Sequence, residues 1–165
     1  MRNVMRGAGL IAAGLLCGAC VTVPAPAPAT AARDAEYHRP PGNDYEAAFV
    51  KEDGVLPIRW GGWMKPVVAG TGAAPTVEDK VTVNYRGTLT DGTEFDSSYK
   101  RGRPATFPLS GVIPCWTNGM MMMRVGGKAK FVCPAAVAYG DAGSPPAIPG
   151  GATLVFEIEL LDVVR

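Results

Sequence analysis

The sequence contains very little histidine. Its 165 residues include one, His38, with no second histidine and no cysteine close to it. A zinc or similar metal site needs several such side chains at short spacing. We therefore expect no metal, no cofactor and no reaction that depends on a histidine acid or base. The methionine run at 120–123 is expected to fill the core and cover helix surface rather than to bind copper.

An excess of positive charge is also missing. The chain has 16 lysine and arginine residues against 15 aspartate and glutamate residues, for a formal net charge of +1. The densest basic group, which comprises Lys100, Arg101 and Arg103, falls in a predicted loop. A nucleic-acid-binding surface needs a larger basic patch or stripe. The sequence therefore predicts no nucleic-acid partner.

Long apolar runs are absent apart from one near the N-terminus. Residues 7–19 consist of Gly, Ala, Leu, Ile and one Cys, and they follow Arg2 and Arg6. This run is shorter than the roughly 20 residues that cross a bilayer. A basic start, a short apolar run and small residues after it are typical of a secretory signal peptide. Residues 1–19 therefore predict export to the periplasm or cell envelope.

The end of this signal predicts a lipid anchor. Residues 16–20, LCGAC, resemble a bacterial lipobox, in which a small residue precedes the cysteine that receives the lipid. That cysteine is Cys20, although Cys17 stands where lipoboxes favour leucine. The alternative is ordinary cleavage after Ala19 or within 27–31, which releases a soluble protein. With Cys20 lipidated, the protein contacts the membrane only through its anchor.

A tether and a short extension follow the signal. Residues 20–43 are rich in alanine and proline, which favours an extended spacer of about 3.1 Å per residue. In residues 44–63 we expect a short helix that Asp44 caps and Gly54 ends. This segment is too short for a dimerisation helix, so we predict a monomer. Trp60 and Trp63 are expected to pack against the edge of the following domain.

The remaining residues predict an α+β domain. Val81, Val83 and Tyr85 alternate with polar residues, as in a half-buried strand, and Asp91-Gly92 is typical of a hairpin turn. Further alternation predicts strands around 107, 129–133 and 154–160. One helix is expected at 114–123, with a proline at its first turn and Gly126-Gly127 after its end. This single helix must cover the apolar face of an antiparallel sheet.

Three segments of this domain carry a resemblance to a known family. They are VTVNYRGTLTDGTEFDSS at 81–98, VIPCW at 112–116 and AYGDAGSPPAIPGGATLVF at 138–156. Together they resemble the FKBP-type peptidyl-prolyl cis-trans isomerases, over a domain at 64–165. The resemblance implies a twisted antiparallel sheet of five to six strands wrapped over one short α-helix. It also implies isomerase activity in protein folding, proline-containing polypeptides as clients, macrolides as inhibitors and no cofactor.

The resemblance also assigns a substrate cleft. Trp116 would lie under the proline ring, Asp96 would contact Tyr85 and pair with Arg101, and the Ile113 N–H and the Tyr139 hydroxyl would bind substrate carbonyls. The residues assigned to catalysis are Tyr85, Phe95, Asp96, Trp116, Tyr139 and Phe156. Those assigned to substrate binding are Phe107, Val112, Ile113 and Ile148.

The sequence departs from the family pattern at three places. Ala105 replaces an aromatic residue of eukaryotic members, which makes one side wall of the cleft smaller. The loop at 140–150, rich in Gly and Pro, is expected to influence substrate choice. Cys115 stands where the family often has glycine, and it is expected to pair with Cys133 in an oxidising compartment; two buried free thiols are the alternative.

Two functions are compatible with these residues. The first is an exported prolyl isomerase that assists the folding of envelope proteins. The second is a binding or chaperone module that holds proline-containing segments in the same cleft without catalysis. Retention of Phe95, Asp96, Trp116 and Tyr139 favours the enzyme, because inactive members of the family tend to lose such residues.

Overall fold

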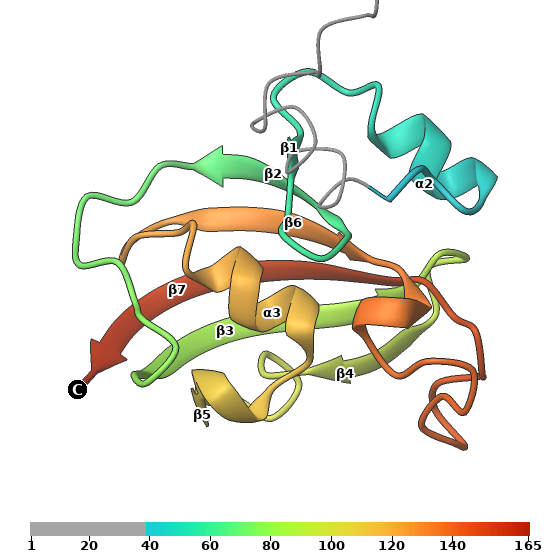
Figure 1. Cartoon of the computed structure of the whole chain (residues 1–165). Helices are drawn as coiled ribbons and strands as arrows, with labels where there is room; N and C mark the ends of the chain where they lie inside the picture. Colours follow the sequence, from blue (N-terminus) through green and yellow to red (C-terminus); the bar gives the residue numbers. More distant parts are fainter. Residues whose placement is uncertain (1–38) are drawn as a thin grey trace, which may run out of the picture.

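A seven-stranded antiparallel sheet organises residues 39–165, which are the residues that the computed structural model describes. The strand order is β1-β2-β6-β7-β3-β4, and β5 pairs with β3 beside β4. Figure 1 shows the sheet bending around the short helix α3 (Pro114–Met120). The strands are β1 (Leu56–Pro57), β2 (Trp63–Val68), β3 (Lys80–Leu89), β4 (Glu94–Ser97), β5 (Ala105–Pro108), β6 (Lys128–Cys133) and β7 (Leu154–Val164). The α+β class expected from the sequence is confirmed.

The main core lies between α3 and the inner face of the sheet. Alternate residues of β3 and β7 point to this face and are buried, among them Val81, Val83, Phe156 and Ile158. These two central strands pair along most of their length. Because every second side chain of a strand faces the same side, the alternation in the sequence fixes which residues meet the helix.

Helix α3 is shorter than expected and ends at Met120. Pro114 occupies its first turn, where the missing N–H costs no hydrogen bond. Met120 and Met123 are buried, whereas Met121 and Met122 are exposed. The methionine run therefore divides between core and surface as its spacing predicts.

The N-terminal extension adds a second apolar cluster on the outer face of the sheet. Helix α2 (Asp44–Phe49) buries Phe49 against Trp63, Val132 and Val155. The expected cap was wrong by one residue, because the Asn43 side chain, not Asp44, accepts the Glu46 N–H at 2.9 Å. The extension also contributes β1, which is why the sheet has more strands than the five or six expected.

The two tryptophans of the extension differ in their environment. Trp63 is buried in the outer cluster, as expected. The prediction for Trp60 was wrong, since it lies at the tip of the β1–β2 hairpin and is 53% exposed. Its φ of 71° is in the left-handed region, and the Arg59 guanidinium lies 4.8 Å from its ring centroid. The two glycines that follow it also have positive φ and complete the tight turn.

A disulfide joins α3 to the end of β6. Cys115 and Cys133 are bonded, with their Cα atoms 5.8 Å apart, and both are fully buried. Of the two alternatives for these thiols, the structure has the bridge. Gly62 of the β1–β2 hairpin packs directly against it, since a Cβ at this position would lie 3.2 Å from Cys115 Sγ.

Predictions for the N-terminal region fall largely outside the described residues. The signal peptide at 1–19, lipidation at Cys20 and nearly all of the tether at 20–43 precede residue 39. Within residues 39–165, no helix combines the length and the apolarity needed to cross a membrane.

Candidate active site

An apolar cavity opens between α3 and the sheet. Its volume is about 300 Å³, and nine of the ten residues assigned to the cleft line it: Tyr85, Phe95, Asp96, Phe107, Val112, Ile113, Trp116, Tyr139 and Phe156. We call it the aromatic cavity. The tenth, Ile148, is buried in the core and lies outside this lining set. Gly111 also lines the cavity, and the sequence analysis missed it because a glycine has no side chain to signal a binding role.

Trp116 forms the floor of the aromatic cavity. It lies in the first turns of α3 and is 4% exposed. Its ring meets those of Tyr85, Phe107 and Phe156 edge to face, at centroid distances of 5.2, 5.9 and 5.1 Å. Edge-to-face packing adds stabilisation beyond simple burial. The floor is therefore apolar and held in place by three neighbours on different strands.

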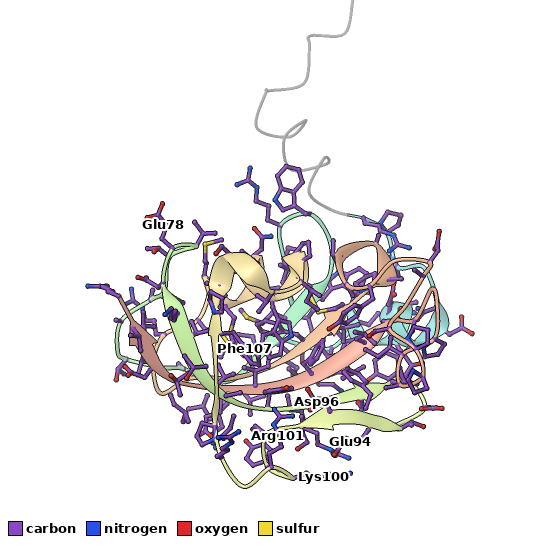
Figure 2. All side chains as sticks on the ribbon, turned by 90° about the horizontal axis from the view of Figure 1, so that it is seen from below. Glu78, Glu94, Asp96, Lys100, Arg101 and Phe107 are labelled. Atoms are coloured by element: carbon purple, nitrogen blue, oxygen red, sulfur yellow. A yellow bond between two sulfur atoms is a disulfide. The ribbon has the colours of Figure 1, made fainter. Side chains whose placement is uncertain are left out.

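A small polar group stands at one side of the cavity. The Tyr85 hydroxyl donates to Asp96 Oδ2, and Arg101 Nη2 donates to the Tyr85 hydroxyl at 2.8 Å. The Arg101 guanidinium also pairs with the Asp96 carboxylate. In Figure 2, Asp96 and Arg101 lie next to each other near the β4 edge, with Phe107 farther inside. The pairing of Asp96 with Tyr85 and Arg101 matches the arrangement that the resemblance implied.

These contacts change the pKa values of both acidic groups. Burial is the main reason why the pKa of Tyr85 lies above its usual value, and its hydrogen bond to Asp96 adds to the increase. Burial alone would raise the pKa of Asp96, but hydrogen bonds from Tyr85 and Arg101 and the Arg101 charge together lower it. Asp96 is therefore an anion at neutral pH and Tyr85 is a neutral hydroxyl.

The mouth of the cavity is formed by two loops. Ile113 is the N-cap residue of α3 and lines the cavity together with Val112. Tyr139 follows the 3-10 helix η2 (Ala135–Val137) and is 43% exposed. A partly exposed phenol at the mouth can contact an extended chain, whereas the buried floor can contact only what enters the cavity.

A second cavity of about 330 Å³ lies at the junction of α2 and the loop before β7. It is lined by small and polar residues, including Arg39, Asn43, Glu46, Asp141 and Thr153, and by no aromatic side chain. An apolar proline ring would find little apolar contact there. The aromatic cavity is the one whose chemistry suits such a ring.

Comparison with known proteins identifies the family of the chain. The model of the FKBP-type peptidyl-prolyl cis-trans isomerase family matches residues 72–161. FKBP-type peptidyl-prolyl cis-trans isomerase FkpA of Escherichia coli K12 is 50% identical over 131 residues, which are 79% of this chain and 48% of the relative. Peptidyl-prolyl cis-trans isomerase Mip of Coxiella burnetii is 44% identical over 112 residues, 68% of this chain and 49% of the relative.

Solved structures give the same result. The crystal structure of FkpA from Escherichia coli has a TM-score of 0.71 at 52% identity and covers 74% of this chain and 57% of that one. The crystal structure of a peptidyl-prolyl cis-trans isomerase from Pseudomonas syringae has a TM-score of 0.70 at 35% identity. The match covers 86% of this chain and 99% of that one. The chain spans about half the length of the curated relatives that it matches. The chain belongs to the FKBP-type peptidyl-prolyl cis-trans isomerase family.

Proposed function

We propose that this protein catalyses the cis–trans isomerisation of peptide bonds that precede proline. The observation that carries this proposal is the aromatic cavity, with a buried Trp116 floor and a single polar group at its side. Its volume of about 300 Å³ suits one proline ring with part of the preceding residue. Membership of the family supports the same reaction.

The reaction neither forms nor breaks a covalent bond. Rotation about the X-Pro amide meets a barrier of about 20 kcal/mol because amide conjugation is lost in the twisted state. A catalyst must hold the ring, exclude water from the amide and bind the twisted form better than either planar form. An apolar aromatic cavity meets the first two requirements. Groups at its edge must supply the third.

We assign the individual roles by resemblance to the family, at positions that line or adjoin the cavity. The Trp116 ring supports the proline ring, while Tyr85, Phe95 and Phe156 surround the twisting amide. The Ile113 N–H and the Tyr139 hydroxyl bind substrate carbonyls at the mouth. Phe107 and Val112 add apolar contact, and we retain Ile148 as a residue that supports the cavity from the core.

Asp96 acts through its fixed charge and position. Its carboxylate is held by Tyr85 and Arg101, so it remains ionised beside the cavity. As the amide twists and loses conjugation, the carbonyl carbon becomes more electron-poor, and an anion close to that carbon can stabilise its positive partial charge. No proton needs to move in this step, which fits a site without histidine.

We further propose that the protein works on proline-containing clients in the cell envelope, as a monomer. The order of segments along the chain supports this arrangement: a signal at 1–19, a tether at 20–43, an extension at 44–63 and the domain at 64–165. In this proposal the lipid is attached at Cys20. The Cys115–Cys133 bridge is consistent with an oxidising compartment. Metabolic labelling with a radioactive fatty acid checks the anchor: label on the wild type and none on Cys20→Ser supports it.

A protease-coupled assay on Leu-Pro and Phe-Pro tetrapeptides tests the activity. We expect clear acceleration at micromolar protein, and a loss of about tenfold or more in kcat/KM for Trp116→Ala because the floor is removed. Far-UV circular dichroism shows that the variant is folded. Wild-type protein that binds the peptide without acceleration would reject the enzyme and favour a binding module.

A further inference from the structure

A buried carboxylate connects the N-terminal extension to the loop that carries Tyr139. Glu46 of α2 is 1% exposed. It accepts hydrogen bonds from the Gly42 N–H at 2.6 Å, from Asn43 Nδ2 at 2.9 Å and from Thr153 Oγ1 at 2.6 Å. Asn43 Nδ2 also donates to Thr153 Oγ1 at 2.9 Å. We call these four residues the Glu46 cluster.

The cluster joins parts of the chain that are far apart in sequence. Glu46 and Thr153 are separated by 107 positions. Thr153 immediately precedes β7 and ends the segment at 138–153, here called the cleft loop. In Figure 1, α2 and this orange-red loop lie at the same end of the sheet. The extension therefore contacts the cleft loop at its C-terminal end.

The contact depends on these hydrogen bonds more than on packing. The cavity of about 330 Å³ lies between α2 and the cleft loop, and its other lining residues include Ala135, Ala136, Gly140 and Gly151. Small side chains around a hollow provide few van der Waals contacts. A buried acceptor that loses its donors is costly, so the hydrogen bonds of the Glu46 cluster hold its geometry.

The ends of the cleft loop are fastened to each other. The Gly151 N–H donates to the Gly140 carbonyl at 3.0 Å, and the Gly143 N–H donates to the Tyr139 carbonyl at 3.1 Å. Tyr139 lines the aromatic cavity directly before this paired neck. A shift of Thr153 is therefore transmitted through Gly151 and Gly140 to Tyr139.

We propose that Glu46 is a positioning residue for substrate recognition: through Thr153 it fixes the cleft loop and so the Tyr139 hydroxyl at the mouth of the aromatic cavity. This inference rests on the proposed isomerase function. Glu46 touches no substrate, so it acts on binding and selectivity rather than on the twisting amide. The extension outside the family-matched region, 72–161, is thereby part of the recognition apparatus.

Substitutions at Thr153 test the proposal most cleanly. Thr153→Val keeps the shape and removes the hydroxyl, Thr153→Ser keeps the hydroxyl, and Glu46→Gln places an amide among three donors. Glu52→Gln is the control, because Glu52 follows the same helix but pairs with Lys65 at the exposed surface. Peptide KM and kcat are measured for each, together with amide hydrogen exchange of residues 139–152.

We expect KM to rise about threefold to tenfold in Thr153→Val and Glu46→Gln, with kcat within twofold of wild type. Exchange in the cleft loop should accelerate about tenfold, while β3 and β7 keep their protection. Thr153→Ser and Glu52→Gln should match wild type. This combination supports the proposal.

Three results would overturn it. They are unchanged loop exchange in Thr153→Val, faster loop exchange without a change in KM, and loss of protection throughout β3 and β7, which would make the role purely structural. An inactive wild type would instead reject the proposed function. Peptide Kd would then replace KM and decide the role of Glu46 by the same criteria.

Discussion

Breaking the Cys115–Cys133 bridge should remove about 3 kcal/mol from the free energy of unfolding. The cysteines are 18 positions apart, and closing a loop of this length restricts the unfolded chain by about that amount at 25 °C. Both cysteines are fully buried, and their Cα atoms are 5.8 Å apart, a usual spacing for a disulfide. Since domains of this size are stable by about 5–15 kcal/mol, the loss is large but leaves the protein folded.

Urea unfolding at 25 °C measures this difference directly. Three samples are compared: oxidised wild type, wild type reduced under denaturing conditions and refolded with reductant, and the double variant Cys115→Ala with Cys133→Ala. The first two differ only in the covalent bond, so their difference isolates the effect on the unfolded chain. The third adds the loss of two sulfur atoms from the core and should be lower by about another 1–2 kcal/mol.

The slope of the unfolding curve provides a check on this reasoning. The reduced unfolded chain is less compact than the cross-linked one, so its m-value should rise. A difference below about 1 kcal/mol between oxidised and reduced wild type, at equal m-values, would refute the argument. It would mean that the unfolded state already holds these segments together.

Two further predictions concern the Asp96 charge and the disulfide neighbour Gly62. Because the pKa of Asp96 is lowered in the folded protein, the carboxylate and the activity that depends on its charge persist as pH falls to its ordinary pKa of about 3.9 and are lost only below it. NMR exchange of a Xaa-Pro peptide should therefore show an acid limb below about pH 4 that Asp96→Asn lacks; an identical limb in the variant would contradict the assignment. Gly62→Ala should destabilise the protein by about 1–3 kcal/mol, because φ is 95° and the new Cβ would lie 3.0 Å from the Val132 carbonyl oxygen. Gly54→Ala, with φ of 78° in open space, should cost less in the same urea experiment, and equal losses would exclude contact with Val132 as the cause.

The aromatic cavity was predictable because the resemblance to the FKBP-type isomerases assigned its residues to a cleft, and these residues lie in short, continuous motifs. Tyr85, Phe95 and Phe156 sit on strands whose period of two fixes the face on which they emerge. Trp116 follows a proline that starts a helix, which places it in the first turn. Expectations from such local patterns hold in the folded protein because the strands and the helix that carry these residues are themselves indicated by the local sequence.

Contacts between distant segments were less predictable. Asn43 and Glu46 have the spacing of a helix cap, and that signal was available, yet Asp44 was preferred for the cap. Nothing local indicates that Thr153 would complete the cluster. Trp60 was expected to pack against the domain edge, whereas it lies in a tight turn with Gly61 and Gly62 and is 53% exposed. Turn geometry outweighed hydrophobic burial at this position.

The segment from Cys133 to Thr153 is fixed at each end by a contact with a distant part of the chain. The disulfide joins its start to α3, two residues from the Ile113 cap and adjacent to Trp116. The Glu46 cluster joins its end to α2. Tyr139 lies between these two attachments, so the distance across the mouth of the aromatic cavity depends on both. A cleft that recognises a peptide by contacts at its mouth benefits from such constraints, because a mouth free to adjust would lose conformational entropy each time it bound a peptide. The bridge therefore stabilises the fold and also fixes one end of the segment that carries Tyr139, and the proposed role of the buried carboxylate is to fix the other end.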